Sequence, residues 1–242
     1  MGPSQPKLYR ERAISLLQRW YLPFLPASVQ EQHRARLRRD AFTRILREKR
    51  WGNDHISGGG SSIAYTEVTR QILLKVVVEL RVASLLDVAC GDFVWMPLVL
   101  QQLPEGFEYV GSDIVSELIA QHCQRHAQYE FRVIDFVNGE LPRCDLILCR
   151  DALQHLPVDD IQQALRNFSR SGANYLLATT HLRRYGWRNA RDKRAGQCLD
   201  RNLLLEPFNL ADPLAIFSEQ DPGHKFLGLW KLPLLDAKGN AI

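Results

Sequence analysis

An apolar run that ends in an acid and a glycine-bearing turn is the strongest constraint on the fold of this chain. Residues 82–86, Val-Ala-Ser-Leu-Leu, predict a buried strand. The segment Asp-Val-Ala-Cys-Gly-Asp-Phe follows at residues 87–93, and residues 94–100 then predict a helix. A strand, a tight turn and a helix bring backbone N–H groups toward a bound cofactor. This unit therefore predicts an α/β fold with a ligand site at the turn.

A second acid lies where a nucleoside-binding fold needs one. Asp113 ends the next apolar run, residues 107–111, and stands 22 positions after Gly91. An acid at an offset of roughly 20 residues can bind ribose hydroxyls. The spacing thus predicts a ligand that contains a ribose.

Apolar runs and helical patterns alternate along the rest of the chain. Such alternation predicts a doubly wound, mainly parallel sheet. The predicted strands are 84–89, 107–112, 129–134, 144–149, 173–179, 213–218 and 226–232, and the predicted helices are 7–21, 28–50, 66–80, 93–103, 114–126 and 158–170.

Acids stand at the ends of four successive predicted strands. They are Asp87, Asp113, Asp135 and Asp151. Ligands of open α/β sheets bind outside the carboxyl ends of the strands. Because a buried carboxylate is costly unless it is paired, packing alone does not account for four acids at one edge.

These motifs resemble those of the class I S-adenosylmethionine-dependent methyltransferases. The first motif of that family is an acid followed by three alternating glycines; here only Gly91 keeps its place, and Ala89 and Phe93 occupy the other two. The missing third glycine argues against a dinucleotide site. It fits a methyltransferase variant, because S-adenosylmethionine has no pyrophosphate. The resemblance runs from about Gly58 to the C-terminus, and implies a Rossmann-like sheet of about seven strands with a closing antiparallel pair.

The resemblance also implies a cofactor site for S-adenosylmethionine. Its residues would be Asp87, Ala89, Gly91, Asp92, Trp95, Asp113, Ile114, Asp135, Phe136 and Arg150. Asp87 would order the turn or meet the ammonium group, Asp113 would bind the ribose, and Asp135 would accept from the adenine amino group. Phe136 and Ile114 would bracket the ring. Asp92 and Trp95 have local alternatives, a helix cap and a core position.

The fourth motif carries the predicted catalytic pair. Residues 144–157 read Cys-Asp-Leu-Ile-Leu-Cys-Arg-Asp-Ala-Leu-Gln-His-Leu-Pro, so Asp151 and His155 are four residues apart. On one helical turn they would face the same side. An acid beside an imidazole raises its basicity and fixes its tautomer. The predicted roles are general base for His155 and orienting residue for Asp151; a structural histidine under the cofactor is the alternative.

Three functions fit these motifs. The favoured one is O-methylation of a small-molecule or glycan-type acceptor, because His155 can deprotonate a hydroxyl. Residues 181–206 form a long connection rich in Arg, Lys and aromatic side chains, which would help to build the acceptor site. The second is methylation of RNA or protein, although the Asn/Asp-Pro-Pro-Tyr motif is absent. The third is a binding module without catalysis.

The basic charge is concentrated at the start of the chain. Residues 1–50 hold 12 Lys and Arg against 4 Asp and Glu, whereas residues 51–242 hold 19 against 23. We therefore expect a basic helical extension, the N-terminal arm (1–50), before a catalytic domain (51–242). Such an arm fits an acidic partner, an anionic membrane surface or, less well, nucleic acid; a solvated helical face is the alternative.

The remaining sequence features concern location and mobility. The five cysteines form no C-x-x-C pair and no zinc spacing, so the sequence predicts a reduced, cytoplasmic protein and no metal site. No stretch is long and apolar enough for a membrane span. The glycine-rich segment 51–62 precedes the first strand and predicts a lid over the cofactor; a simple linker is the alternative.

Overall fold

The computed structural model describes residues 24–52, 56–182, 189, 194–219 and 224–242. The chain divides into two compact units, Met1–Asp40 and Ala41–Ile242. The predicted helix over 7–21 lies outside the described residues. Helix α2 (Ala27–Arg47) includes the end of the first unit and the beginning of the second. The last ten residues of the N-terminal arm thus belong to the larger unit.

Within the first unit, charged side chains of α2 pair along one side of the helix. Glu31 accepts hydrogen bonds from Arg34 and Arg38, each at 2.8 Å. The Arg34 pair has the (i, i+3) spacing that supports a helix, whereas Arg38 lies seven residues from Glu31 and its side chain is almost completely buried.

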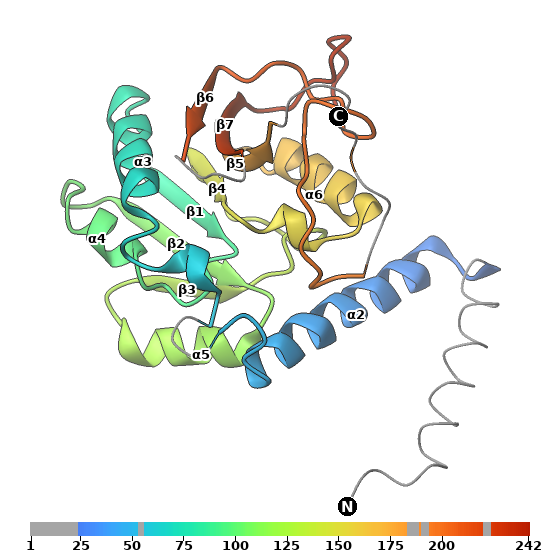
Figure 1. The fold of residues 1–242 in the computed structure, drawn as a ribbon, viewed down its shortest axis with the longest axis horizontal. Coiled ribbons are helices and arrows are strands. Elements are labelled where there is room, and N and C mark those ends of the chain that lie inside the picture. Colours follow the sequence, from blue (N-terminus) through green and yellow to red (C-terminus); the bar gives the residue numbers. More distant parts are fainter. Residues whose placement is uncertain (1–23, 53–55, 183–188, 190–193, 220–223) are drawn as a thin grey trace, which may run out of the picture. The chain divides into compact units, whose positions relative to one another are not determined.

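The larger unit is built on a seven-stranded sheet in the order β3-β2-β1-β4-β5-β7-β6 (Figure 1). The strands are β1 (Ser84–Val88), β2 (Glu108–Asp113), β3 (Glu130–Val133), β4 (Leu146–Cys149), β5 (Tyr175–His181), β6 (Ala215–Ser218) and β7 (Lys225–Lys231). The first five pair in parallel, and β7 lies antiparallel between β5 and β6. The predicted doubly wound sheet with its closing antiparallel pair is confirmed.

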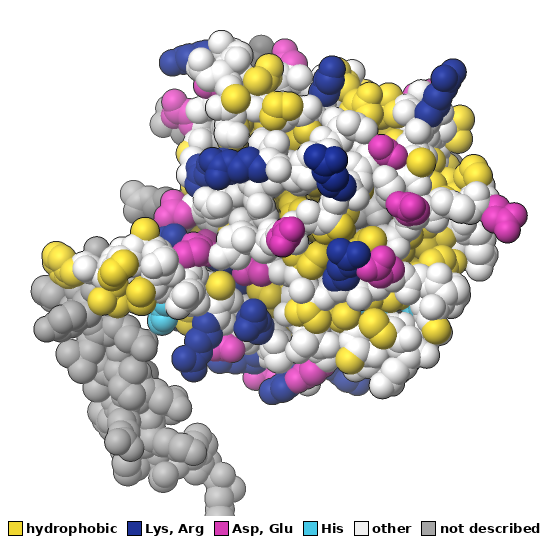
Figure 2. Space-filling model, turned by 180° about the vertical axis from the view of Figure 1, so that it is seen from behind, with side chains coloured by type: hydrophobic (Ala, Val, Ile, Leu, Met, Phe, Trp, Pro, Cys, Tyr) yellow, Lys and Arg dark blue, Asp and Glu magenta, His cyan; other side chains and the backbone are white. Residues whose placement is uncertain are grey.

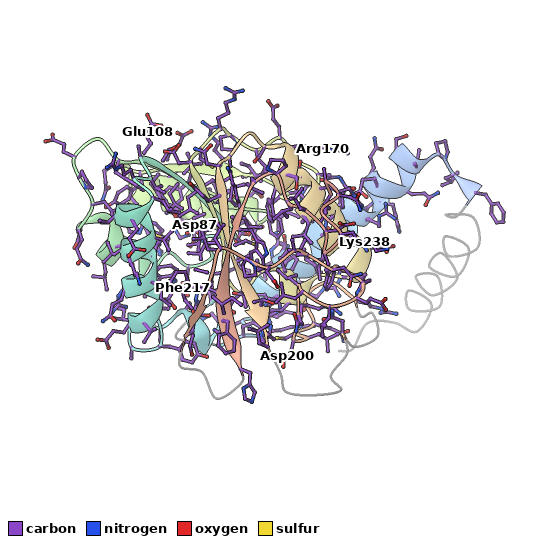
Figure 3. All side chains as sticks on the ribbon, turned by 90° about the horizontal axis from the view of Figure 1, so that it is seen from above. Asp87, Glu108, Arg170, Asp200, Phe217 and Lys238 are labelled. Atoms are coloured by element: carbon purple, nitrogen blue, oxygen red, sulfur yellow. The ribbon has the colours of Figure 1, made fainter. Side chains whose placement is uncertain are left out.

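Helices cover both faces of this sheet. The described helices of the larger unit, besides the end of α2, are α3 (Glu67–Glu79), α4 (Met96–Leu100), α5 (Ser116–Arg125) and α6 (Val158–Arg170), with short 3-10 turns η2 (Gly59–Ser61) and η3 (Leu153–His155). Helices α3 and α4 lie on one side and α6 on the other, as Figures 1 and 3 show from two directions.

Alternating side chains of the strands fill the two cores. Leu85 of β1 and its partner Leu146 of β4 pack with α3 and α4, whereas the next pair, Leu86 and Ile147, packs with α6. All four side chains are essentially buried. Continuous apolar strands are expected in a parallel sheet covered on both faces, because every side chain enters a core.

The predicted boundaries of the described strands and helices agree with the structure to within three residues. The largest difference is in the helix predicted over 93–103, which is three residues shorter at each end, at Met96–Leu100. Phe93 has a φ of +56°, which is not a helical conformation, so the helix cannot begin at this residue. Pro97 stands in the first turn of the helix, where its missing N–H would have no hydrogen-bond partner in any case.

The surface that Figure 2 presents carries interspersed charges. Lys and Arg side chains alternate with Asp and Glu across it. Among the described helices, none has the length and apolarity needed to cross a bilayer.

Candidate functional site

The predicted site residues follow the strands at one edge of the sheet. Parallel strands β1, β2, β4 and β5 all end there. Asp113 is the last residue of β2, and Gly91 and Asp151 lie in the turns after β1 and β4. This is the edge where open α/β sheets bind ligands.

The turn after β1 depends on glycine at position 91. Gly91 has a φ of +55°, and a Cβ placed on it would lie 2.4 Å from Ser57 Oγ. His122, on α5, contacts the Gly91 carbonyl oxygen through Nε2 at 2.7 Å. A side chain at this position would therefore be strained and would collide with the segment above it. The half-buried Ala89 precedes this turn.

Asp113 lies beside the glycine turn with little exposure. Its Oδ1 accepts a hydrogen bond from the Val115 N–H at 3.0 Å. Burial raises the pKa of Asp113 to about 6, although the N–H groups of Val115, Gly91 and Ile114 act to lower it. Half-buried Ile114 follows it directly. The carboxylate is thus close to the turn and ionises near neutral pH.

Asp87 lies buried in β1, in the interior of the sheet (Figure 3). Its Oδ2 accepts a hydrogen bond from the Tyr109 hydroxyl at 3.0 Å. Burial raises the pKa of Asp87 to about 7, against the lowering effect of that bond, and the charge of Asp113 raises it further. Of its two predicted roles, this position favours ordering the turn.

Asp135 and Phe136 follow β3. Asp135 Oδ1 accepts from the Val137 N–H at 3.2 Å. Phe136 stacks on Phe168 of α6 with 5.8 Å between ring centroids. One face of Phe136 is therefore occupied by the core, and the ring is held rigidly at the edge of the sheet.

Asp92 binds the segment that precedes α3. Its backbone N–H donates to Ser57 Oγ at 2.8 Å, and its Oδ2 accepts from Ser61 Oγ at 3.0 Å. Asp92 is thus hydrogen-bonded to two serines of the predicted lid (51–62), next to the turn at Gly91. No side-chain cap bond forms at the start of α4.

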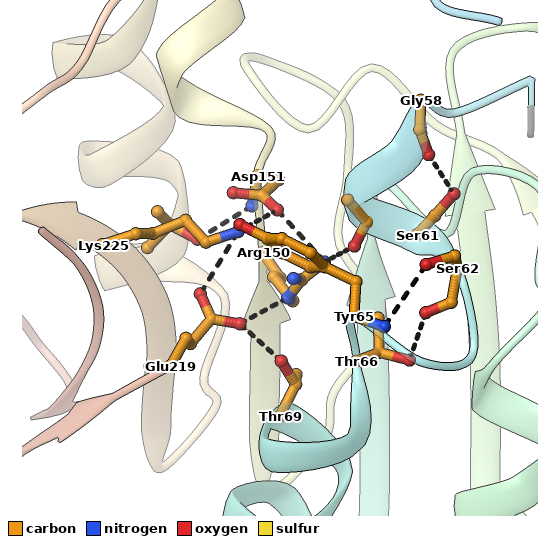
Figure 4. A network of polar contacts seen from close by, with 12 residues as sticks. Gly58, Ser61, Ser62, Tyr65, Thr66, Thr69, Arg150, Asp151, Glu219 and Lys225 are labelled. Atoms are coloured by element: carbon orange, nitrogen blue, oxygen red, sulfur yellow. Dashed lines mark hydrogen bonds and ion pairs between the residues drawn. The ribbon is translucent and has the colours of Figure 1, made fainter. Parts of the chain in front are cut away.

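Arg150 is the centre of a buried network of charges (Figure 4). Its Nε donates to Glu219 Oε1 at 2.7 Å, and its Nη1 donates to the Gly60 carbonyl oxygen at 3.0 Å. The guanidinium also lies 5.9 Å from the Trp95 ring centroid. Trp95 is 7% exposed and packs in the core with α3 and α4. Arg150 therefore connects the predicted lid to the last strands of the sheet.

Asp151 and His155 do not share a helical turn, which corrects the predicted local conformation. Asp151 has a φ of +53° and precedes the 3-10 turn Leu153–His155. A residue in the left-handed conformation cannot be part of a right-handed helical turn. The Asp151 side chain therefore does not point to the same side as His155 in the way that the four-residue spacing predicted. Its Oδ2 is bound by Lys225 at 2.9 Å and Arg150 at 3.1 Å.

His155 is packed against an aromatic ring. Its ring stacks on Trp51 with centroids 4.6 Å apart, and its Nδ1 is buried without a hydrogen-bond partner in the described part of the chain. Burial lowers the pKa of His155 to about 4, although the charge of Asp151 acts to raise it. The imidazole is consequently uncharged at neutral pH.

The end of the long connection after β5 is anchored beside His155. Gly196 N–H donates to the His155 carbonyl oxygen at 2.8 Å, and Leu199 N–H donates to that of Gln154 at 2.9 Å. The tyrosine and tryptophan on which the acceptor prediction partly depended, Tyr185 and Trp187, lie outside the described residues.

Several residues at this edge were not predicted from the sequence. They are Trp51, Ser57, Ser61, Glu219 and Lys225. Trp51, Ser57 and Ser61 belong to the predicted lid, segment 51–62, but were not singled out within it. Glu219 and Lys225 border the last two predicted strands, in segments without a recognisable motif.

The residues at this edge fit S-adenosylmethionine. Gly91 leaves the turn without a side chain, at a position where a Cβ would meet Ser57 Oγ, and its N–H bonds to the Asp113 carboxylate. A bare backbone turn beside a carboxylate matches the amino-acid and ribose parts of that molecule.

Part of the chain matches the model of a known family. Residues 86–173 match the methyltransferase domain, and this segment contains the Gly91 turn, Asp113 and His155. Among curated proteins, none matches the sequence.

The fold is similar to that of solved methyltransferases. The 1,6-didemethyltoxoflavin-N1-methyltransferase of Burkholderia thailandensis is 15% identical, with a TM-score of 0.59 over 83% of this chain and 89% of that one. The N-methyltransferase NodS of Bradyrhizobium japonicum is 15% identical, with a TM-score of 0.55 over 80% and 98%. The mitomycin 7-O-methyltransferase MmcR is 17% identical, with a TM-score of 0.56 over 78% and 60%.

At these identities the likeness shows a shared fold. The family-model match is a separate observation: residues 86–173 match a methyltransferase domain in sequence. A methyltransferase-domain match on a fold that methyltransferases share supports assignment of the chain as an S-adenosylmethionine-dependent methyltransferase.

Proposed function

We propose that this chain methylates a hydroxyl group of a small-molecule or glycan-type acceptor, with His155 as the general base. The observation that carries the proposal is the buried His155 Nδ1, which has no hydrogen-bond partner among the described residues. An imidazole nitrogen left open beside a cofactor edge can accept the proton of an acceptor hydroxyl.

The cofactor would lie across the carboxyl ends of β1, β2 and β3. Gly91 would admit its amino-acid part, Asp113 would accept from the ribose hydroxyls, and Asp135 would accept from the adenine amino group, with Ile114 and Phe136 on either side of the ring. The bound cofactor supplies an electrophilic methyl group. Ala89, Asp92, Trp95 and Arg150 would shape the pocket, and Asp87 would support it from below.

His155 would act in its neutral form. With a pKa of about 4 the imidazole is uncharged at neutral pH and carries a single N–H, and in the tautomer with that proton on Nε2 its Nδ1 can accept another. It is a weak base in this environment, and the proton would therefore move late, as the oxygen gains its methyl group. Asp151 would act on the imidazole through its charge, since its carboxylate is bound by Lys225 and Arg150.

The acceptor would be recognised by the connection after β5. Seven Arg or Lys side chains lie between residues 181 and 206. Basic and aromatic side chains suit a sugar or another polar, anionic acceptor. The anchoring of Gly196 and Leu199 beside His155 supports this placement.

An amine acceptor is the second candidate for the same site. Two of the similar structures are, by their names, N-methyltransferases. An uncharged amine is already nucleophilic, so positioning alone would suffice and His155 would not be needed as a base.

We further propose that the N-terminal arm (1–50) associates with an acidic partner or an anionic membrane surface. Its charge excess supports this role. Two alternatives remain as outcomes of product analysis. A methylated RNA or protein would indicate that the arm recruits a macromolecule, and the absence of any methylated product would indicate a binding module.

Substitution of His155 tests the proposed reaction. His155→Ala should lower turnover roughly 100-fold or more, the usual range for loss of a general base. Affinity for S-adenosylmethionine should stay within about twofold, because the imidazole would act on the acceptor. Turnover is measured with labelled cofactor and fractions of glycan, lipid, RNA, protein and small molecules, and affinity by calorimetry.

The exposed His224 provides a matched control, and His224→Ala should leave both values unchanged. If His155→Ala retains turnover, an already nucleophilic acceptor is indicated. Equal loss of turnover and cofactor affinity would instead place His155 in the cofactor pocket.

A further inference from the structure

The Asp151 carboxylate is directed toward two cations. Lys225 Nζ donates to its Oδ2 at 2.9 Å, and Arg150 Nη1 lies 3.1 Å from the same oxygen. The Asp151 N–H donates to Thr179 Oγ1 at 2.8 Å, which holds the left-handed turn in place. The position of this carboxylate is thus determined by contacts from β4, β5 and β7.

A second carboxylate completes the cluster (Figure 4). Glu219 contacts Arg150 at 2.7 Å and Lys225 at 3.6 Å, and it accepts a hydrogen bond from Thr69 of α3. Arg150, Glu219 and Lys225 are each less than a tenth exposed. Two cations and two carboxylates balance in this buried space, so loss of one partner would leave an uncompensated charge.

Lys225 is held in place on its other side by an aromatic ring. Its Nζ lies 4.7 Å from the centroid of Tyr65. A buried ammonium over a ring face is stabilised by the ring quadrupole. Lys225 therefore has one preferred position, between Tyr65 and the two carboxylates.

His155 faces this cluster without joining it. No hydrogen bond connects Asp151 to the imidazole in the described part of the chain, yet the charge of Asp151 acts on it. Trp51 covers the ring, and Cys198, from the segment after β5, bonds to the neighbouring Gln154. Burial has the larger effect on the pKa of His155, and Asp151 is the charged group that acts against it.

We infer that Lys225 is a positioning residue: with Arg150 it holds the Asp151 carboxylate off His155, so that the imidazole meets the acceptor without an acidic partner. The inference concerns the orientation of Asp151, and its significance for catalysis rests on the proposed function. Through Lys225, strand β7 of the closing antiparallel pair would then help to determine the environment of His155.

The inference predicts how His155 titrates when Lys225 is removed. In Lys225→Met, Asp151 loses a cation and becomes free to accept from the imidazole. The pKa of His155, followed by NMR of the ring protons in the full chain without cofactor, should rise by about one unit or more, a tenfold gain in proton affinity. Lys225→Arg, which keeps the charge, should leave it within about 0.3 unit of the parent.

Two further variants separate this from a general charge effect. Lys231→Met removes an exposed cation from the same strand and should not move the pKa. In an Asp151→Asn background, Lys225→Met should also leave the pKa of His155 unchanged, because the responding carboxylate is gone. If Lys225→Met does not fold, Lys225→Gln, which keeps a donor but no charge, should give a smaller rise.

An unchanged pKa in Lys225→Met, or an equal rise with and without Asp151, would overturn the inference. Neither result depends on methyl transfer, so failure of the inference is distinguishable from failure of the proposed function. If His155 is also the base, the acidic limb of the pH–rate profile should shift to higher pH in Lys225→Met, by the same amount as the pKa of His155.

Discussion

At the scale of the single residue, Asp113 couples cofactor binding to pH. Its pKa is raised to about 6 by burial, from an ordinary value near 3.8. Below that pKa the carboxyl group is protonated and loses acceptor capacity for the ribose hydroxyls. Affinity for S-adenosylmethionine should therefore increase as pH rises from 5 to 7.5 and then level off. Calorimetry across this range checks the expectation.

Replacement of the same carboxyl group supplies the control. Asp113→Asn keeps an oxygen that can accept from the Val115 N–H, but it cannot ionise. It should weaken cofactor binding by roughly 1.5–3 kcal/mol at pH 7.5, the scale of hydrogen bonds to a charged group. It should also flatten the pH dependence. A flat profile in the parent would place the ribose elsewhere.

At the scale of the element, the turn after β1 and the segment above it form one unit. Gly91→Ala would place a methyl group 2.4 Å from Ser57 Oγ, in a backbone conformation with positive φ. The variant should lose the Ser57–Asp92 contact, weaken cofactor binding about tenfold or more, and lose roughly 1–2 kcal/mol of stability, the cost of a left-handed alanine.

Gly106→Ala separates strain from contact. Gly106 also has a positive φ, +85°, but a Cβ there would meet nothing within 4 Å. It should cost similar stability in thermal unfolding and leave cofactor affinity unchanged. Equal effects of the two variants on affinity would show that the contact with Ser57 is unimportant.

The elements themselves could largely be predicted from the sequence. The side chains of parallel strands enter a core on both faces, so β1, β4 and β5 each contain a continuous apolar run that predicts a strand. Lys225 could not be predicted as a site residue, because its role depends on β7 lying antiparallel beside β5. The left-handed conformation of Asp151 was equally hidden, since the four-residue spacing to His155 suggested a helix.

At the scale of the whole molecule, the basic arm can be tested by truncation at the unit boundary. Removal of residues 1–40 should reduce association with anionic vesicles, more so at low salt, because screening weakens surface electrostatics. Cofactor affinity should be retained, since Ala41–Ile242 is a compact unit by itself. Vesicle sedimentation and calorimetry measure the two effects. Unaltered vesicle binding would show that residues 1–40 do not mediate association with an anionic membrane surface.

The antiparallel return of β7 has a consequence for biosynthesis. Domains generally begin to fold from the N-terminal side as they are made. The glycine turn and Asp113 are complete once β1 and β2 exist, whereas Lys225 is added 112 residues after Asp113. A nascent chain therefore forms its glycine turn well before Lys225 can reach Asp151. A fragment that ends at residue 173, where the matched segment ends, would keep the glycine turn and Asp113 but would lack the Lys225–Asp151 contact.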